Sequence, residues 1–538
     1  MSRSELRRLQ EVPLALAGRR FDAAMAEELL AWNTRGVYTE EAATGQHVIS
    51  TRWVLTEKPG ELPQDPPKRK ARLFVRGFED PQKASVVSTS PTVGRASLCV
   101  LLDTMAVRVW VPRTVDVGTA LLQGLPLDQV ALVYVQPPPQ ARIPTGVVWR
   151  LRKCAYGLTD APRRWYEAVL VLMINLGYDR VEPDHGLFVL VLDGTLEFTA
   201  AVHVDHSKYA GVAKEVARFE TALRAVFDVG PVRICNLTFT GLRIACDTDA
   251  SSGKMVIAVD QDHYLESIEE IDVSSERAAG RSAAVSTSEF TLYRRAVVAL
   301  LWASGQTQPF MACHSSLLAG RFHKAVVHDL LAVNRVVRAA RAASGLPLLF
   351  TAVAPPHRLV LFADASSITS SLASAKTGDL VLLASDAPVR GSLSPDTPLF
   401  LLAWGSHKQR RVTHSSFAAE TYALLDGMCA AITSATFLSR RPGHAELGAA
   451  AALAGAGVGV RMPEVWRPEE FEAAVLVSAQ AAAAATVPFS AARNGNRVAA
   501  LLGGGMWAAA WHAFAAQPHP TGAAPDSTCA APFTGGFL

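Results

Sequence analysis

Two apolar segments flank a short polar turn in the stretch AVHVDHSKYAG, which covers residues 201–211. Residues 196–202 and 207–213 have the composition of strands, and the turn VDHS between them is short enough to join paired neighbours. The segments are therefore predicted to form a hairpin with Asp205 in its turn. A carboxylate in such a turn can lie close to acidic side chains at the ends of neighbouring strands in the same sheet.

The chain has 538 residues, which is too long for one hydrophobic core, so roughly three to four domains are expected. Hydrophobic residues make up 49% of it, which supports a folded body for most of the length. The net charge is only +3, so it neither requires nor excludes nucleic acid. Any surface that binds nucleic acid must therefore be local.

Seven cysteines are scattered without CxxC pairs, so neither a disulfide framework nor a zinc site is expected. This usage predicts a reducing, intracellular compartment, without distinguishing cytoplasm from nucleus. The N-terminus MSRSELRRLQEV is basic but lacks the apolar core of a secretory signal. The Ala/Gly stretch 448–460 is too short and too weakly apolar to span a bilayer, so no membrane partner is expected.

Helices are expected where apolar residues recur at helical spacing, and strands where they alternate or cluster between turns. A further hairpin is predicted from residues 47–56 and 69–78, joined by the Pro-rich stretch PGELPQDPPK. Asp160 is expected to cap a helix over 161–177, with Pro162 in its first turn. The other predicted helices are 21–35, 95–108, 214–227, 290–305, 324–344 and 415–439, and the other predicted strands are 112–118, 358–364, 379–384 and 399–405.

Asp116 ends the apolar segment TVDVG, and Asp205 lies in the predicted hairpin turn. Each alone is most simply a capping or turn residue. Together they suit a template-directed polymerase, which needs carboxylates that converge on two Mg²⁺ ions, and hard oxygen ligands suit Mg²⁺. Carboxyls more than about 8 Å apart could not hold a metal pair spaced at roughly 3.5–4 Å.

Many stretches, in order, resemble the copia-type reverse transcriptase domain over roughly residues 20–270. Most belong to the predicted strands and helices named above. The segment FDVGPVRICNLTFTGLRI (227–244) is similar to the family's palm end and primer grip. The stretches are TRWVLTEK (51–58), KARLFVRGFED (70–80), SPTVGRASLCVLL (90–102), TVDVGTALLQG (114–124), VYVQPP (133–138), VWRLRKCAYGLTDAPRRWYE (148–167), LGYDRVEPDHGLFV (176–189) and AVHVDHSKYAG (201–211).

The resemblance implies that Asp116 and Asp205 are the first two metal-binding carboxylates. The family's third carboxylate falls at position 206, where this chain has His206. Imidazole is neutral near pH 7 and suits borderline metals better than Mg²⁺. Loss of one positioned electrostatic group costs roughly 3 kcal/mol, or about a hundredfold in rate.

The resemblance also assigns residues to the nucleotide pocket. Arg72, with Lys70, would contact triphosphate oxygens; without the family match these are simply basic residues of a solvated strand. The family has an aromatic residue under the sugar where this chain has Leu121, and a Gln at the nucleotide where it has Asp160. The Asp160 charge would face an anionic triphosphate, or it would serve only as a helix cap.

Two acidic residues downstream resemble a retroelement ribonuclease H site. Asp364 ends the apolar segment RLVLFAD, and Glu420 lies on the predicted helix SSFAAETYALLDGMCAA. The resemblance makes them the first two ligands of two further Mg²⁺ ions. The third acid should follow about thirty residues later, where GHAELGAAAALAGAG contains no Asp. Individually, either acid is equally a surface or capping residue.

The resemblance implies an α+β chain with a right-hand polymerase of fingers, palm and thumb or connection. An incomplete ribonuclease H-like α/β domain and an Ala/Gly-rich tail follow. The expected boundaries are an N-terminal extension at 1–20, fingers and palm at 21–270, thumb or connection at 271–350, a partial ribonuclease H-like domain at 351–440, and an unassigned tail at 441–538.

The implied function is RNA-directed DNA polymerisation by two-metal nucleotidyl transfer. The implied partners are an RNA or DNA template, a DNA primer and deoxynucleoside triphosphates. The alternative is a catalytically inactive retroelement relic that at most binds nucleic acid, which the changes at 121, 160 and 206 favour. An unrelated α/β protein would not carry so many stretches in order. Because no zinc knuckle, aspartic protease or integrase core is recognised, the chain is expected to be a fragment of a polyprotein or the product of a gene model that captured only its last part.

Overall fold

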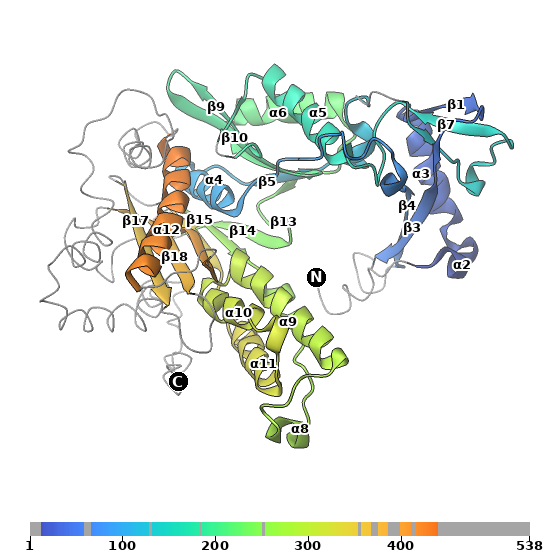
Figure 1. The fold of residues 1–538 in the computed structure, drawn as a ribbon. Coiled ribbons are helices and arrows are strands. Elements are labelled where there is room, and N and C mark those ends of the chain that lie inside the picture. The colour runs from blue at the N-terminus through green and yellow to red at the C-terminus, as the bar shows by residue number, and fades with distance from the viewer. Residues whose placement is uncertain are drawn as a thin grey trace, which may run out of the picture. The chain divides into compact units, whose positions relative to one another are not determined.

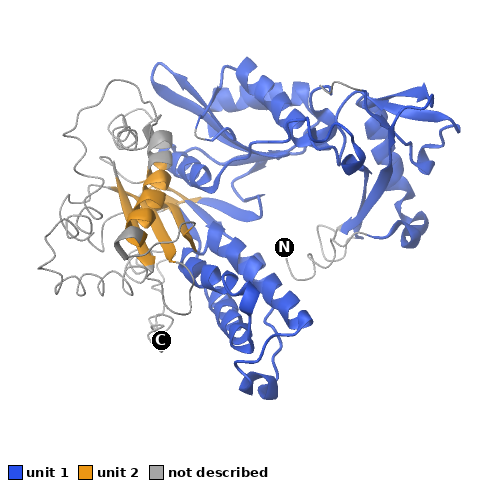
Figure 2. Ribbon diagram, viewed as in Figure 1, with its two compact units in different colours: residues 1–246, 257–349, 436–445 blue, residues 247–256, 350–435, 446–538 orange. Residues whose placement is uncertain are grey.

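The computed structural model describes residues 12–58, 66–127, 132–182, 184–249, 253–352, 357–366, 375–385, 399–409 and 416–439. The predicted tail and residues 1–11 lie outside these ranges. The fold is mixed α/β, with helices and strands interleaved along the chain (Figure 1). The described residues of 1–246, 257–349 and 436–445 form one compact unit, and those of 247–256 and 350–435 form a second (Figure 2).

The first unit begins with helix α3 packed on a long hairpin. Helix α3 (Asp22–Thr34) buries Met25 and Trp32 against strand β4 (Lys68–Val75), which pairs antiparallel with β3 (Thr51–Lys58). Burial alternates along β4, so its central basic residues and its buried apolar residues lie on opposite faces. Three shorter helical turns are α2 (Leu14–Ala17), η1 (Gly18–Phe21) and η2 (Gly77–Glu79).

A small sheet of order β1-β7-β6-β2 adjoins this hairpin through a shared hydrophobic core. Trp149 lies at its centre, with its ring centroid 3.9 Å from that of Tyr38 and 5.9 Å from that of Trp32. These aromatic contacts join the sheet to α3. The strands are β1 (Tyr38–Ala42), β2 (Val48–Ile49), β6 (Tyr134–Val135) and β7 (Val147–Leu151), and η4 (Pro139–Ala141) precedes β7.

A six-stranded sheet of order β12-β5-β11-β10-β9-β8 carries the predicted hairpin near its centre. The hairpin strands pair antiparallel from Phe198↔Gly211 to His203↔His206, so its prediction is confirmed. The strands are β5 (Arg113–Asp116), β8 (Asp179–Arg180), β9 (Leu187–Leu192), β10 (Thr195–His203), β11 (His206–Gly211) and β12 (Arg233–Ile234). The turn η3 (Ala120–Gln123) follows β5.

Helices α5 (Ala161–Asn175) and α6 (Ala213–Val226) cover one face of this sheet (Figure 1). The core between them is aromatic, with Phe198, Tyr209 and Phe219 within about 6 Å of one another. Helix α4 (Arg95–Arg108) has the predicted bounds and is buried from Ser97 to Ala106.

The prediction that the Asp160 side chain caps α5 is wrong. Asp160 precedes α5, but it has helical dihedral angles, and its side chain makes no capping hydrogen bond. A capping side chain accepts from the second or third amide of a helix, and the second residue here is Pro162, which has no N–H. The Asp160 carboxylate is instead buried, at 4% exposure, beside the Cys154 thiol.

The rest of the first unit combines a four-stranded sheet with a bundle of helices. A capping box starts α9 (Thr287–Gln306), because Ser286 Oγ accepts from Glu289 N, and Ser286 N donates to the Glu289 carboxylate. The sheet, of order β13-β14-β15-β16, contains β13 (Leu237–Phe239), β14 (Leu242–Thr248), β15 (Met255–Asp260) and β16 (Leu348–Thr351). The other helices are α7 (Asp262–Ser267), α8 (Ser275–Ala279), α10 (Ala312–Ala319) and α11 (Val327–Ala342), with turns η5 (Pro309–Met311) and η6 (Phe322–Lys324).

The second unit is a three-stranded antiparallel sheet with one helix. Strand β17 (His357–Ser366) pairs with β18 (Lys376–Ser385), which pairs with β19 (Leu399–Lys408). Helix α12 (Ser416–Ser439) packs on this sheet through Gly427. The four elements agree with the predicted ones. No helix in the described part of the chain is long and apolar enough to cross a membrane.

Candidate nucleotidyl-transfer site

The pairing of β5 with β11 brings the predicted carboxylates together. Asp116, the last residue of β5, is the register partner of His206, the first residue of β11. The Val117 amide donates to the Asp205 carbonyl oxygen at 2.9 Å, which fixes the turn beside the end of β5. Since neighbouring strands lie close, these two contacts place Asp116, Asp205 and His206 at one edge of the sheet.

The hairpin turn itself has only two residues, Val204 and Asp205. Val204 adopts φ of +54°, a value that β-branched residues rarely take and that carries backbone strain. Its carbonyl oxygen accepts from the Trp165 indole of α5 at 2.6 Å. Helix α5 therefore holds the strained turn in place from the covered side of the sheet.

His206 lies between the two carboxylates. Its Nδ1 is 3.2 Å from Asp205 Oδ1 and 3.6 Å from Asp116 Oδ1. Ligand atoms of the three residues all lie within 4.8 Å of one another, and no other such cluster occurs in the described ranges. This separation is well inside the limit of about 8 Å beyond which the carboxylates could not share a metal pair.

The pKa values of Asp205 and His206 are shifted by their neighbours. The hydrogen bond that His206 Nδ1 donates to the Asp205 carboxylate raises the pKa of His206, burial opposes this, and the charge of Asp116 adds to it. Burial alone would raise the pKa of the Asp205 carboxyl, but the hydrogen bond and charge of His206 outweigh it, and the net pKa is lowered. Arg72 contributes in the same direction. The cluster therefore favours an imidazolium beside two carboxylates.

Two carboxylates and one imidazole are the side chains that this cluster offers to a divalent cation. Donors around Mg²⁺ are at most about 4.2 Å apart, so small side-chain rotations of Asp116 and Asp205 would bring two oxygens onto one ion. His206 offers a nitrogen only when it is deprotonated, and nitrogen ligands suit Mn²⁺ or Zn²⁺ better than Mg²⁺. Asp116 and Asp205 are 57% and 37% exposed, which leaves them accessible.

Of the predicted nucleotide-binding residues, Arg72 acts electrostatically on the acidic cluster. Its guanidinium stands over the Tyr156 ring at 5.2 Å, and its charge acts on Asp205. Lys70 lies on the same face of β4, and both residues act on the buried Glu28 carboxylate of α3. Their contact with a triphosphate stays a prediction.

Leu121 and Asp160 lie in packed surroundings. Leu121, in the turn after β5, packs against two hydrophobic cores at once, one below the β3–β4 hairpin and one below α5. Asp160 is almost wholly buried, so its carboxylate would reach a nucleotide only if the chain around it moved. Their proximity to a bound nucleotide stays a prediction.

Arg163 and Arg164 both bond to the Glu167 carboxylate, at 2.7 and 2.9 Å. A contact between these two arginines and template phosphates would therefore compete with a carboxylate of the same helix. This competition weakens them as anion-binding residues.

In the second unit, Asp364 and Glu420 are close enough to interact. The Ala365 amide donates to Glu420 Oε2 at 3.0 Å. Burial, and then the charge of Asp364, raise the pKa of Glu420 to about 7, and burial raises that of Asp364. The segment expected to carry a third acid lies outside the described residues, so the ribonuclease H-like role of this pair stays a prediction.

Two features near the site were missed from the sequence. The first is Lys208, two residues beyond His206 on β11, which is fully buried with its Nζ 5.1 Å from the centroid of the Phe239 ring. The sequence signal that could have revealed it is a lysine in the middle of a predicted strand. Burial lowers its pKa far below the ordinary value.

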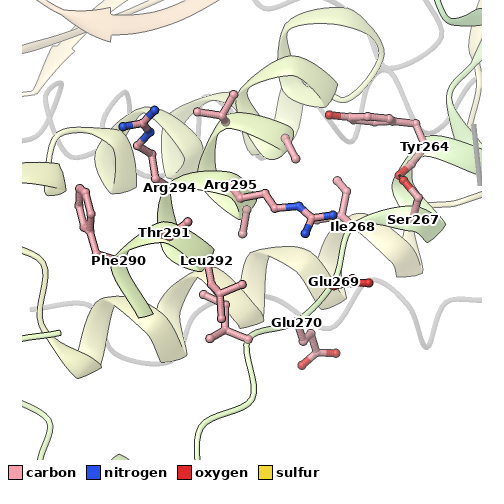
Figure 3. Close-up of a pocket in the computed structure, with 14 residues that line it drawn as sticks. Tyr264, Ser267, Ile268, Glu269, Glu270, Phe290, Thr291, Leu292, Arg294 and Arg295 are labelled. Carbon is pink, nitrogen blue, oxygen red and sulfur yellow. The ribbon is translucent and has the colours of Figure 1, made fainter. Parts of the chain in front are cut away.

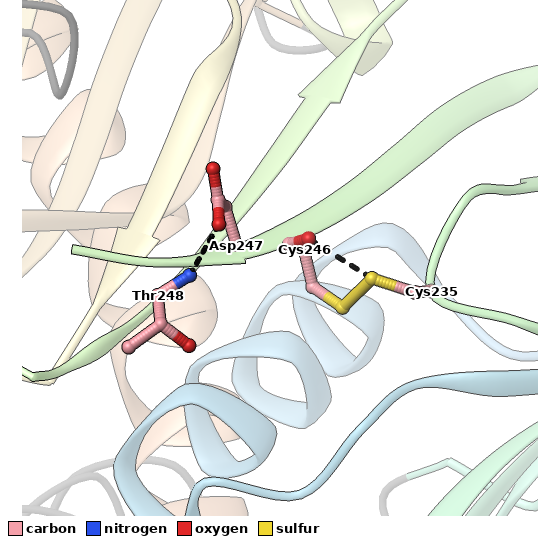
Figure 4. Close-up of a disulfide and its surroundings, with 4 residues drawn as sticks. All are labelled: Cys235, Cys246, Asp247 and Thr248. Carbon is pink, nitrogen blue, oxygen red and sulfur yellow. Dashed lines mark hydrogen bonds between the residues drawn. A yellow bond between two sulfur atoms is a disulfide. The ribbon is translucent and has the colours of Figure 1, made fainter. Parts of the chain in front are cut away.

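The second missed feature is a disulfide between Cys235 and Cys246 (Figure 4). It corrects the expectation that the cysteines would form no disulfide. The two residues are separated by 11 positions in sequence. Continuing the β13–β14 register beyond Leu237↔Ile244 sets them opposite each other, a relation that depends on hairpin register and that spacing alone does not reveal.

A groove of about 680 Å³ lies in the first unit between the end of α7 and helix α9. Arg295 extends along it toward Ile268, with Phe290 on another side (Figure 3). It is separate in sequence from the acidic cluster. Since the described ranges hold metal-ligating spacing only at Asp116, Asp205 and His206, the groove is not a second candidate metal site.

Comparison with known proteins gives a family match over residues 38–275, to the reverse transcriptase (RNA-dependent DNA polymerase) family. Two Pol polyproteins of Arabidopsis thaliana transposons, RE2 and RE1, are 33% and 31% identical over 149 and 184 residues. These alignments cover 27% and 33% of this chain but only 10% and 12% of the relatives' length.

Two further matches have lower identity. A putative transposon Ty5-1 protein of Saccharomyces cerevisiae is 26% identical over 52% of this chain and 91% of its own length. A solved foamy viral protease–reverse transcriptase in complex with double-stranded DNA matches 76% of this chain and 60% of that chain, with a TM-score of 0.43 and 11% identity. This last similarity is too weak to support an inference. Residues 38–275 therefore belong to the reverse transcriptase family, and their homologues are retrovirus-related Pol polyproteins from copia-type transposons.

Proposed function

We propose that this chain is an RNA-directed DNA polymerase of weakened activity, with Asp116 and Asp205 as its metal-binding carboxylates. The observation that carries the proposal is the register of β5 and β11, which gathers Asp116, Asp205 and His206 within 4.8 Å. Its substrates would be a primed RNA or DNA template and deoxynucleoside triphosphates. Residues 21–270 would be fingers and palm, and 271–350 the thumb or connection.

Asp116 and Asp205 would hold the divalent cations, expected to be two Mg²⁺, which polarise phosphoryl oxygens and lower the pKa of the attacking hydroxyl. The sheet edge orients the two carboxylates, and Trp165 holds the turn that carries Asp205. Arg72 would bind triphosphate oxygens from β4. Leu121 would lie under the sugar, where a smaller, more flexible side chain excludes a 2′-hydroxyl less well.

His206 would lower activity for two reasons. As an imidazolium it occupies the space between the carboxylates and repels a cation; as a neutral ring it brings no negative charge. If it replaces one positioned electrostatic group, the loss is roughly a hundredfold in rate. The contact of His206 with both carboxylates also favours the second candidate, a relic that binds nucleic acid without extending a primer.

Primer extension on an RNA template separates the two candidates. The native chain, His206→Asp, and His206→Asp with Asp205→Asn would be compared in Mg²⁺ and in Mn²⁺. We expect weak extension by the native chain, about a hundredfold more by His206→Asp, and none when Asp205 is also changed. If His206→Asp extends no better than the native chain, His206 is not the limiting residue.

Template–primer affinity, measured in parallel over a salt series, tests the relic. Affinity that falls with rising salt, without extension by any variant, would favour it. Affinity independent of salt would exclude electrostatic binding to the phosphate backbone and with it this candidate. For the second unit, a Mg²⁺-dependent cleavage of RNA–DNA hybrid that Glu420→Gln abolishes would support a ribonuclease H-like pair.

A further inference from the structure

Residues 228–235 run antiparallel beside β5, the strand that carries Asp116. The Gly230 amide donates to the Asp116 carbonyl oxygen at 2.8 Å, and the Cys235 amide donates to that of Pro112 at 3.0 Å. Between these bonds, the two residues of β12 pair with β5. This segment therefore bonds directly to the backbone of the residue that presents the first carboxylate.

The start of this segment is held by Asp228, which pairs with Arg35 at 2.7 Å and whose amide donates to Gln123 Oε1 at 2.9 Å. Its end is β12, the edge strand of the six-stranded sheet, which pairs with β5 through only two residue pairs. Arg233 is exposed, and Ile234 is 47% exposed, so neither side chain buries much apolar surface. Short, exposed edge pairings of this kind open at low free-energy cost. A covalent anchor at one end would therefore change how firmly the segment rests on β5.

The Cys235–Cys246 disulfide is such an anchor. Cys235 ends the segment, immediately after β12, and Cys246 lies on β14, an inner strand of the neighbouring sheet. Both cysteines are half-buried, so a small reductant can reach the bond. Phe239 of β13 also contacts Lys208 of β11, so the β13–β14 hairpin stays against the catalytic strands without the disulfide.

We propose that the Cys235–Cys246 disulfide is a positioning device for the reaction, holding residues 230–235 on β5 and thereby fixing the carboxylate of Asp116. This role rests on the proposed function. When the bond is reduced, residues 230–235 are free to leave β5, while Asp228 stays bonded to Arg35 and Gln123 and the β13–β14 hairpin remains docked. Asp116 then loses the partner of its carbonyl oxygen, and its carboxylate samples a wider range of positions.

Reduction of the Cys235–Cys246 bond requires an external dithiol, and its reoxidation requires an external disulfide. Reduction by dithiothreitol transfers two electrons and two protons to the sulfur–sulfur bond, giving two thiols and the cyclic disulfide of the reagent. Oxidised glutathione reverses the step by thiol–disulfide exchange and leaves with the two electrons as two glutathione thiols. No atom of the site is altered in either direction.

The test compares the oxidised chain, the chain reduced with dithiothreitol, and a double variant in which Cys235→Ser and Cys246→Ser abolish the bond. A matched control changes Cys313→Ser and Cys429→Ser, which lie on α10 and α12 and leave the disulfide intact. Alkylation and mass spectrometry count the free thiols of each form. Hydrogen exchange is then followed in peptides that cover 228–236 and 112–117.

We expect exchange in both peptides to be about tenfold faster or more in the reduced chain and in the double variant, with the control unchanged. In primer extension, kcat should fall between roughly tenfold and a hundredfold, with an unchanged KM for the nucleotide, and reoxidation should restore it. A merely stabilising disulfide would change the unfolding midpoint but not kcat below that midpoint.

Three results would overturn the proposal. Free thiols at positions 235 and 246 in the oxidised chain would show that the bond is absent. Unchanged exchange after reduction would show that the bond does not hold the segment. Faster exchange with an unchanged kcat would show that the segment does not position Asp116. If no form extends a primer, even with His206→Asp, the proposed function fails, and the exchange data still decide whether the disulfide holds the segment on β5.

Discussion

Lys208 gives a quantitative test of how the candidate site is built. Its side chain is fully buried on β11, and its Nζ has no hydrogen-bond partner among the described residues. Its Nζ faces the ring of Phe239, 5.1 Å from the ring centroid. We predict that Lys208→Met stabilises the chain, because Met keeps the length of the side chain and removes the buried amine.

The expected gain follows from two opposing contributions. A buried donor without a hydrogen bond costs roughly 1–3 kcal/mol, and this cost disappears in the variant. The cation–π contact with Phe239, which contributes about 1 kcal/mol, disappears as well. The net gain at pH 7 is therefore about 1 kcal/mol, or about 2–4 °C in the midpoint of thermal unfolding.

The pH dependence of stability independently predicts that Lys208→Met is more stable than the native chain at neutral pH. Burial lowers the pKa of Lys208 in the folded chain, so below the ordinary lysine value of about 10.4 the unfolded chain binds more protons at this group. Its contribution to the free energy of unfolding is therefore unfavourable at neutral pH and becomes less so as pH rises toward 10.4. The difference between native chain and variant should narrow over the same range.

Urea unfolding of the native chain and of Lys208→Met at several pH values between 7 and 10 measures both quantities. Lys214→Met, at an exposed position of α6, is the matched control and should change stability by less than about 0.5 kcal/mol. A variant less stable than the native chain at pH 7 would contradict the reasoning. So would a difference that widens with rising pH.

Two further predictions concern close packing and buried charge. Gly157→Ala should lower the free energy of unfolding by more than about 3 kcal/mol, because the new Cβ would overlap the Val75 carbonyl oxygen. Gly177→Ala, which also has a positive φ but has open space around it, should lower it by only about 1 kcal/mol. Thermal unfolding of both variants measures the difference. Burial and the charge of Asp364 raise the pKa of Glu420 to about 7, so the second unit should lose stability as pH rises from about 4.3 to 7. Glu420→Gln should remove that loss in a pH series of unfolding midpoints, and an unchanged pH dependence would contradict it.

The elements that follow from local pattern were predictable from the sequence. Burial alternates along β4 as basic and apolar residues alternate in its sequence, and α4 has the predicted bounds, although it is buried on every side from Ser97 to Ala106. The helix α10 was missed. Its sequence ACHSSLLA is short and lacks a clear apolar stripe, so only packing against α9 selects it.

The missed details of the site depend on contacts between distant segments. The disulfide depends on the β13–β14 register, and the burial of Lys208 depends on Phe239, which is 31 positions away. The prediction that Asp160 caps α5 was wrong, because Pro162 has no N–H to donate to a capping carboxylate. This reason could have been read from the local sequence. The register between paired strands, in contrast, cannot be read from the sequence of either strand alone.

The change at position 206 shows why the fold is no guide to activity here. The side chain of residue 206 projects from the face of β11 opposite to Tyr209, which lies in the core beneath α5 and α6. The β5–β11 pairing itself is made by backbone bonds, to which any residue at 206 contributes equally. Replacing a carboxylate by His206 therefore costs the fold almost nothing, while it removes a negative charge from the edge where a cation would bind. Folding cannot select the residue at 206, and only the chemistry of the site can.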